Sequence, residues 1–300
     1  MSLVNLVNTA SNKEKFLDIQ SFIDFTSCYL EFISNARNIQ ATIISRNENH
    51  YQFIQYKSDG TFNVTRPLNS NLMMSLETFE NSKDKFLTLI SNIRDEKNNL
   101  PQFRELLNNF IYTLQQSIGS ALDALPASRS NTARKLNGDL FERLIRLLLS
   151  EIGLECSSGV IYIPVKIGTE EAFKMSYQHD LIIKSNGELK AFGSVKTSSK
   201  DRLDKIFIDK FLYSKLTDSN IPHFSVFLND VQRKKTSIEG QYGINPTFLS
   251  GHFKGYTIKL NPLDGVYYCD IRPNMISEPI LKDHIKTLDC LLFDDIWSFI

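Results

Sequence analysis

The 300-residue sequence contains 34 basic and 34 acidic side chains, so its formal net charge is zero. This balance excludes a polycation that binds nucleic acid by bulk charge. It does not exclude a local basic cleft, because the local potential governs binding. Hydrophobic residues make up 42% and charged residues 23%, the composition of an ordinary globular protein with a substantial core.

The four cysteines are widely scattered and form neither a CxxC pair nor a zinc pattern, so reduced cytosolic thiols are expected. The sequence has no signal-peptide pattern and no apolar run long enough to cross a bilayer. We therefore expect a cytoplasmic protein without a membrane partner.

The first 126 residues predict an α+β region. Apolar residues at helical spacing favour a helix over 21–38. Three short alternating stretches separated by polar turns predict a small β-meander over 41–64. Two further helices are expected, over 71–95 with an interruption near residue 81 and over 101–125.

The next stretch, 126–135, contains three cations, several hydroxyl groups and no acid. Two interpretations are open, a solvated linker or a loop that contacts phosphate groups. A helix over 139–152 follows, and it is apolar on most faces, which predicts a central position. A strand over 160–167 should begin the core sheet.

A hairpin centred on Asn186-Gly187 is the strongest local signal in the chain. The alternating stretch before this turn begins near Asp180, and the returning strand ends near Lys196. A carboxylate and an ammonium group held side by side form the core of a metal-dependent phosphodiesterase site. The carboxylate binds a divalent ion, and the lysine orients the attacking water.

A helix from about residue 203 to 215 should follow the hairpin, with the hydroxyl groups of Thr197-Ser198-Ser199 as caps. Asp209 lies thirteen positions after Lys196 and could fold back over the end of the hairpin, with Asp201 and Asp204 as competitors for that role.

Beyond this helix, the sequence predicts a strand over 224–228, a late hairpin from strands 256–260 and 266–271, and a closing helix over 278–299.

Three motifs between residues 137 and 215 carry a family resemblance. Ser194-Val195-Lys196 is followed by Asp209, the run from Lys196 to Arg202 reads Lys-Thr-Ser-Ser-Lys-Asp-Arg, and Asn137-Gly-Asp-Leu-Phe-Glu142 starts the upstream helix. This stretch resembles the PD-(D/E)XK nucleases, and within them a branch of type II restriction endonucleases in which the second metal-binding acid has migrated to the following helix. The departures are His179, where a proline is usual, and Asp209, where Glu is commoner.

The resemblance implies an α/β fold with a mixed central sheet flanked by helices over 127–300, preceded by the accessory α+β region. It implies Mg²⁺-dependent, site-specific cleavage of double-stranded DNA. The metal would be held by carboxylates and the water positioned by a lysine, and these catalytic residues are Asp180, Asp209, Glu142 and Lys196.

Relatives of this branch cut CCGG, CCNGG or CCWGG sites, and they read the C·G pairs with the Asp and Arg of the Lys-Asp-Arg run. Arginine pairs with guanine and aspartate accepts from cytosine. The residues expected to contact DNA are Lys200, Asp201, Arg202, Ser194 and Arg134. A homodimer is expected because both strands of a palindrome must be cut, with a tetramer left open. A partner methyltransferase protecting prokaryotic host DNA is implied.

Each residue also has a plainer interpretation. Asp180 and Lys196 alone would read as solvated strand-end charges, and Asp201 and Arg202 as the exposed first turn of a helix. The conjunction of motifs favours the nuclease. Two alternatives remain, a repair or structure-specific PD-(D/E)XK nuclease that cuts without a fixed sequence, and a non-catalytic DNA-binding relative.

Overall fold

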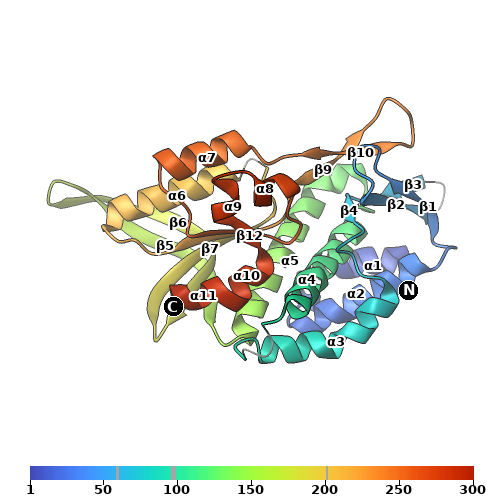
Figure 1. Cartoon of the computed structure of the whole chain (residues 1–300), viewed down its shortest axis with the longest axis horizontal. Helices are drawn as coiled ribbons and strands as arrows, with labels where there is room; N and C mark the ends of the chain where they lie inside the picture. Colours follow the sequence, from blue (N-terminus) through green and yellow to red (C-terminus); the bar gives the residue numbers. More distant parts are fainter. Residues whose placement is uncertain (59–60, 96–98, 201) are drawn as a thin grey trace. The chain divides into compact units, whose positions relative to one another are not determined.

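The computed structural model describes residues 1–58, 61–95, 99–200 and 202–300 (Figure 1). They form two compact units, and the chain enters the first unit twice. The first comprises Met1–Leu148 and Asp230–Thr247, and the second comprises Leu149–Asn229 and Phe248–Ile300. No helix within the described residues is both long enough and apolar enough to span a membrane.

The division into units differs from the expected segments 1–126 and 127–300. The start of the long helix α5 (Ser130–Glu151) is bonded to other parts of the first unit. The Gln115 side chain donates to both oxygens of Asn137, at 3.0 and 2.9 Å, and Lys13 pairs with Asp139 at 2.7 Å. These bonds place the first half of α5 with the N-terminal helices.

The first unit contains a four-stranded antiparallel sheet and several helices. The predicted meander is confirmed, with order β1-β2-β3 and β4 also paired to β2. The strands are β1 (Ile39–Ile44), β2 (Tyr51–Ser58), β3 (Thr61–Val64) and β4 (Leu68–Asn69). The helices are α1 (Leu3–Ala10), η1 (Lys13–Lys15), α2 (Ile19–Ser34), α3 (Leu76–Ser91), α4 (Pro101–Leu122) and η3 (Ala127–Arg129).

Local sequence explains where these helices start. The Asp18 side chain accepts from the Ser21 amide at 2.8 Å in a reciprocal capping box, so α2 begins two residues before the predicted start at residue 21. Pro101 occupies the first turn of α4, where its missing N–H costs nothing. Helix α3 is continuous to Ser91, in contrast to the expected interruption near residue 81.

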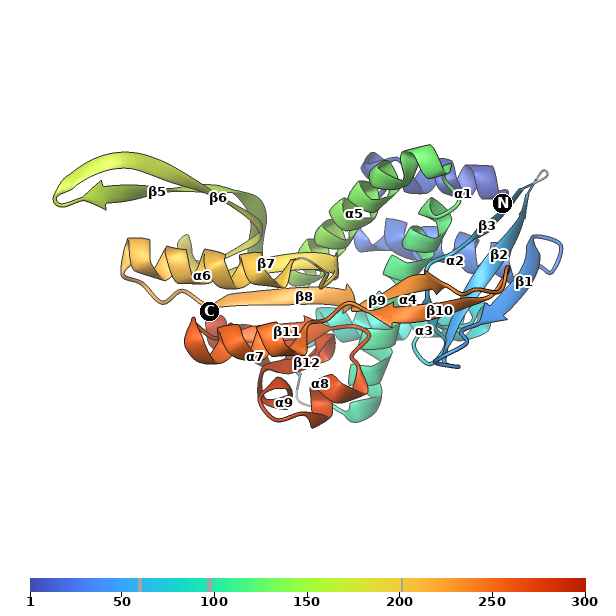
Figure 2. The same ribbon diagram turned by 90° about the horizontal axis from the view of Figure 1, so that it is seen from above.

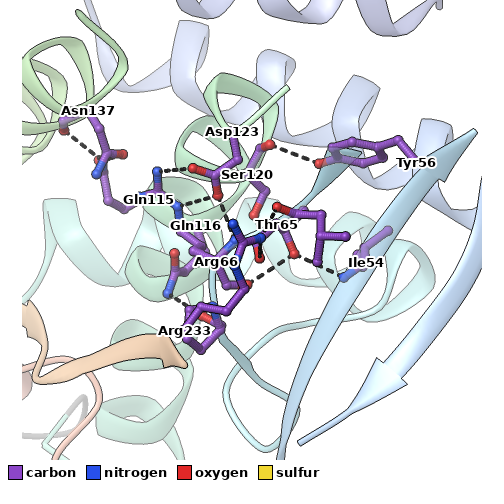
Figure 3. A network of polar contacts seen from close by, with 12 residues as sticks. Ile54, Tyr56, Thr65, Arg66, Gln115, Gln116, Ser120, Asp123, Asn137 and Arg233 are labelled. Atoms are coloured by element: carbon purple, nitrogen blue, oxygen red, sulfur yellow. Dashed lines mark hydrogen bonds and ion pairs between the residues drawn. The ribbon is translucent and has the colours of Figure 1, made fainter. Parts of the chain in front are cut away.

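A polar network lies between the meander and α4 (Figure 3). The Arg66 guanidinium donates two bonds of 2.9 Å to the Asp123 carboxylate, and the Arg66 amide adds a third of 2.7 Å. The Tyr56 hydroxyl donates to the Ser120 carbonyl at 2.9 Å. Such a bidentate pair fixes the relative orientation of the two side chains and also contributes electrostatic attraction. The network therefore determines how the meander packs against α4.

The second unit is built on a six-stranded mixed sheet of order β12-β11-β8-β7-β6-β5. Strands β5, β6 and β7 are antiparallel neighbours, and β7, β8, β11 and β12 run parallel. The strands are β5 (Glu155–Ile167), β6 (Glu170–Ser185), β7 (Glu188–Ser198), β8 (His223–Asn229), β11 (Gly265–Tyr268) and β12 (Ile285–Thr287). Figure 2 shows the far ends of β5 and β6 extending beyond β7 as a two-stranded arm.

Helices cover both faces of this sheet, which explains why β8 is buried along its whole length. One face packs Phe227 against α6 (Leu203–Thr217) and α7 (Ser250–Lys259). On the other face, Phe224 stacks on Phe299 of the C-terminal segment at 5.8 Å. The predicted fold class, a mixed central sheet flanked by helices, is confirmed.

Three predicted secondary-structure elements were wrong. Residues 130–135 form the first turns of α5 and not a linker. Residues 256–260 lie largely in α7, so β11 has no hairpin partner there and pairs in parallel with β8 and β12. The closing helix over 278–299 is broken into α9 (Leu281–His284), β12, α10 (Leu288–Cys290), the π-turn η4 (Leu291–Asp295) and α11 (Ile296–Phe299).

Candidate active site

The predicted hairpin is present as β6, a two-residue turn and β7. Asn186 and Gly187 both have positive φ, 52° and 78°, as a type I′ turn requires. Pairing runs from Ser185 opposite Glu188 to Leu181 opposite Gly193, with one extra residue of β7 between Leu189 and Ala191. A Cβ at Gly193 would lie 2.6 Å from the Phe224 ring, so the close approach of neighbouring strands requires glycine here.

An irregularity of β6 lies at Asp180. Opposite the two residue steps of β5 from Ser157 to Gly159, β6 makes three, from Ile182 to His179. The extra residue brings His179 and Ile182, which an unbroken strand would place on opposite faces, to the same side of the sheet, against Phe192. Bulges of this kind redirect side chains, and here the redirected stretch contains Asp180.

The carboxylate of Asp180 and the ammonium group of Lys196 are in direct contact. Lys196 Nζ donates to Asp180 Oδ2 at 2.5 Å, and the Val195 amide donates to the same oxygen at 2.8 Å. The Asp180 side chain is 14% exposed and that of Lys196 is 29% exposed. The site is therefore a partly desolvated ion pair that a ligand can still reach.

A layer of stacked rings lies behind Asp180. The His179 ring stacks on Phe192 with centroids 3.9 Å apart, and His223 of β8 lies edge-on at 6.1 Å. Burial, together with the nearby His223 and Lys205, lowers the pKa of His179 to about 4. Both rings are therefore neutral near pH 7, and the layer is an uncharged support for the strand that carries Asp180.

The second histidine of this layer is held from several sides. Burial lowers the pKa of His223 to about 4. A bond to the Ile221 carbonyl opposes this shift, Lys210 adds to it, and Asp264 opposes it. Lys210 and Asp264 form a salt bridge of 2.7 Å, and Asp264 also accepts from the His223 amide at 2.6 Å, so the two charges that face His223 largely offset each other.

Helix α6 places Asp209 on its sheet-facing side. Asp209 lies one turn before Tyr213, which packs against Phe192. Burial raises the pKa of Tyr177 on β6, and the negative charge of Asp209 raises it further, which shows that the carboxylate lies near this strand. Asp209 forms an ion pair with Lys205 one turn earlier. Asp204, the competing acid, lies on the exposed side of α6.

The start of α6 differs from the expected form. Strand β7 continues to Ser198, so Thr197 and Ser198 are strand residues and not caps. Arg202 precedes the first helical residue, and its side chain makes no cap hydrogen bond. It is exposed and follows Lys196 closely, whereas Asp201 lies outside the described residues. Lys200 is exposed, and Ser194 is half-buried opposite Ser225 of β8.

Two further predicted residues, Glu142 and Arg134, lie on α5 in the first unit. Arg134 is exposed and contacts Asn131 at 3.4 Å, and Glu142 is half-buried. The residues that the structure brings together within one unit are therefore Asp180 and Lys196, with Asp209 on the adjoining helix.

Comparison with known proteins gives a structural match only. No family model matches the sequence, and no curated protein matches it. The solved structure of the type IIP restriction endonuclease Kpn2I superposes with a TM-score of 0.66 and 18% identity, covering 99% of this chain and 97% of that chain. The chain has the fold of a restriction endonuclease. The complex of restriction endonuclease PspGI with its substrate DNA matches at a TM-score of 0.42 and 16% identity, covering 73% of this chain and 88% of that chain.

In this restriction-endonuclease fold the oxygen donors suit a hard divalent cation. Among the described residues no group of three His, Cys, Asp or Glu side chains is gathered into a metal cluster. Mg²⁺ does not require one, because it is commonly bound through one or two carboxylates and keeps several waters. Asp180, partly exposed at its strand, and Asp209, on the sheet-facing side of α6, are the carboxylates that fit this role.

Sequence reasoning missed the supporting residues of the site. The stacked layer of His179, Phe192 and His223 depends on β8, whose pairing with β7 has no local signal. Lys205 was also missed, although its spacing of four residues before Asp209 is the ordinary signature of a helical ion pair. The β6 irregularity leaves no mark in the alternation around Asp180.

Proposed function

We propose that the protein is a type II restriction endonuclease. It would hydrolyse phosphodiester bonds of double-stranded DNA in a Mg²⁺-dependent reaction at a short palindromic site containing C·G pairs. The observation that carries this proposal is the 2.5 Å contact between Lys196 and Asp180 at one end of the β6–β7 hairpin. A fold shared with Kpn2I supports it.

The chemistry of the chain's own residues follows from this contact. The Val195 amide holds the Asp180 carboxylate in place, and that carboxylate in turn fixes the position of the Lys196 ammonium group. An ammonium group has three donors, so Lys196 can hold Asp180 and also orient a water or a phosphate oxygen. When bound, Mg²⁺ would supply Lewis-acid activation of the water and neutralise charge on the phosphate. Asp180 and Asp209 would hold it, with Glu142 supporting the site.

Base recognition is proposed for the segment between β7 and α6. Arg202 is exposed six positions after Lys196, so a base that it reads lies next to the cut. Arginine pairs bidentately with guanine, which favours a site with C·G pairs. Asp201 would accept from cytosine, while Lys200, Ser194 and Arg134 would contact the DNA backbone.

The biological setting is part of the same proposal. Two active sites are needed to cut both strands of a palindrome, so the enzyme would act as a homodimer or as a higher assembly of dimers. A methyltransferase acting on the same sequence would protect the DNA of a prokaryotic host, and both enzymes would work in its cytoplasm.

Digestion of phage DNA with Mg²⁺, followed by sequencing of the fragment ends, tests the proposal. We expect one recurrent sequence with C·G pairs at all ends, no cleavage in EDTA, and recovery when Mg²⁺ is restored. Cleavage at ends without a common sequence would favour a repair or structure-specific nuclease. Sequence-specific binding without cleavage would favour a non-catalytic relative.

A further inference from the structure

A group of exposed cations lies in the first unit, on and beside a two-stranded hairpin. Strand β9 (Val231–Lys235) and strand β10 (Tyr242–Pro246) form an antiparallel hairpin, with Lys235 opposite Tyr242 and Lys234 opposite Gly243. We call Arg233, Lys234 and Lys235 of β9, with Arg46 after β1, the basic surface. All four residues are exposed.

The hairpin beneath this surface is held rigidly. The Asn47 side chain clamps Ile244, accepting from its amide at 2.9 Å and donating to its carbonyl at 3.0 Å. Ile244 and Val231 are buried in a small core with Tyr51 and Phe53 of β2. A preformed scaffold loses little conformational entropy when a ligand binds, which favours recognition of a partner.

Two of the four cations are tied to the scaffold. Arg233 donates to the carbonyl oxygen of Thr65 at 3.1 Å (Figure 3) and also to that of Val64. Its guanidinium lies 5.3 Å from the centre of the Tyr242 ring. Arg46 donates to the Gln241 side chain. Carbonyl and amide partners leave the positive charges uncompensated.

Carboxylates do not neutralise the surface. Across the residues that the structure describes, none of the four cations forms an ion pair. Within the hairpin segment the acids are Asp230, which is buried, and Glu239 in the connecting loop. Glu48 lies 3.6 Å from His50. In a chain of zero net charge, this is a local positive excess on a rigid ribbon.

We propose that the basic surface binds backbone phosphates of duplex DNA, and that this contact is independent of sequence. The inference rests on the proposed function, since that function brings a DNA duplex to the enzyme. Consecutive strand residues point to opposite faces, so Lys234 lies on the face away from the small core, while Lys235 is exposed at the end of β9, where it can also reach a phosphate. Lysine and arginine are the usual phosphate ligands, and they position a duplex without reading it.

The test compares wild type with the Lys234→Gln/Lys235→Gln variant on a duplex that lacks the recognition site, in Mg²⁺-free buffer, by fluorescence anisotropy. Each lost phosphate contact lowers the salt slope of binding by about 0.9. Two lost contacts mean that wild type loses about tenfold more affinity than the variant between about 50 and 200 mM salt. At the recognition site we expect KM to rise while kcat is unchanged.

Controls separate phosphate binding from other effects. Lys15→Gln/Lys85→Gln removes two exposed lysines elsewhere in the same unit and should leave the salt slope unchanged. Lys234→Arg/Lys235→Arg keeps the charge and should retain the slope. An unchanged salt slope in the Lys234→Gln/Lys235→Gln variant overturns the proposal that the basic surface binds phosphates, but it does not affect the proposed nuclease function. The same conclusion follows if the Lys234→Gln/Lys235→Gln variant loses affinity for polyglutamate, an anionic polypeptide, and keeps its affinity for DNA. Wild type that binds no duplex overturns both proposals.

Discussion

Replacing Lys196 by methionine is the sharpest test of the site, because it removes the charge while nearly conserving the side-chain volume. Lys196 Nζ lies 2.5 Å from Asp180 Oδ2. A hydrogen bond between charged groups contributes about 1.5–3 kcal/mol, and among the described residues Asp180 would keep only the Val195 amide as a hydrogen-bond donor. We expect the free energy of unfolding to fall by about 2 kcal/mol.

The effect on catalysis should be larger than the effect on stability. A group that orients and polarises the reacting water contributes about 10²–10⁴-fold in rate. A loss of about 10³-fold corresponds to about 4 kcal/mol of barrier. Specific DNA binding should stay near the wild-type level, since the lysine acts on the water and not on a base.

The variant should also bind Mg²⁺ more tightly than wild type. A positive charge next to the Asp180 carboxylate opposes a second cation, and removing it relieves that repulsion. We therefore expect Mg²⁺ to raise the melting temperature of Lys196→Met more than that of wild type. This measurement is independent of activity and reports the metal site directly.

Single-turnover cleavage of a plasmid with one site measures the rate, with Lys190→Met as the matched control. Lys190 lies on the same strand and pairs with Glu188 at 2.9 Å, near the turn. Its loss should leave the rate unchanged, because it lies at the opposite end of the hairpin from Asp180, and it should cost little stability, because exposed ion pairs contribute little. Cleavage by Lys196→Met within tenfold of wild type would refute the assignment, as would an equal loss in the control.

Three other expectations can be checked. Asp209→Asn should abolish plasmid cleavage while Asp204→Asn stays active, and the reverse pattern would move the metal-binding acid to Asp204. Arg202→Ala should lose about 10- to 100-fold in affinity for the specific site while random-sequence binding survives, so unchanged discrimination in competition assays contradicts base reading. His223 has a folded-state pKa of about 4, below its unfolded value, so its neutral form stabilises the protein above pH 6.5 and this stability is lost as pH falls toward 4. Urea unfolding at pH 7 and pH 5 should show a loss of about 2 kcal/mol from this group, and His223→Gln should lack it.

Local chemistry explains the parts of the site that the sequence predicted. Asn186-Gly187 can adopt the two positive φ angles of a tight turn at low cost, and the turn then fixes the pairing of the flanking strands. Lys196 reaches Asp180 only because β7 also carries one extra residue opposite the step from Lys184 to Ile183, a register shift that the turn does not specify. The helical position of Asp209, on the same side as Tyr213, follows equally from local periodicity.

Parts that depend on non-local partners were not predictable in this way. Tyr256, Ile258 and Leu260 alternate as a strand would, yet Ile258 is exposed on helix α7, because such a short run fits either structure. Residues Ile285–Thr287 interrupt the expected closing helix because β11 offers a parallel edge. The sequence near residue 285 contains no local signal that predicts pairing with the edge of β11.

The extra residue in β6 has an evolutionary consequence. The alternation of side chains along β6 reverses between His179 and Ile182. Deleting a single residue there would move the side chains on one side of the deletion to the opposite face of the sheet. Either the ring layer or the acidic side chain would then face the wrong way. Homologous chains should therefore differ in side-chain chemistry across this stretch but hardly ever in its length, whereas the turn of the arm at Gly168, with φ of 66°, is free to grow or shrink.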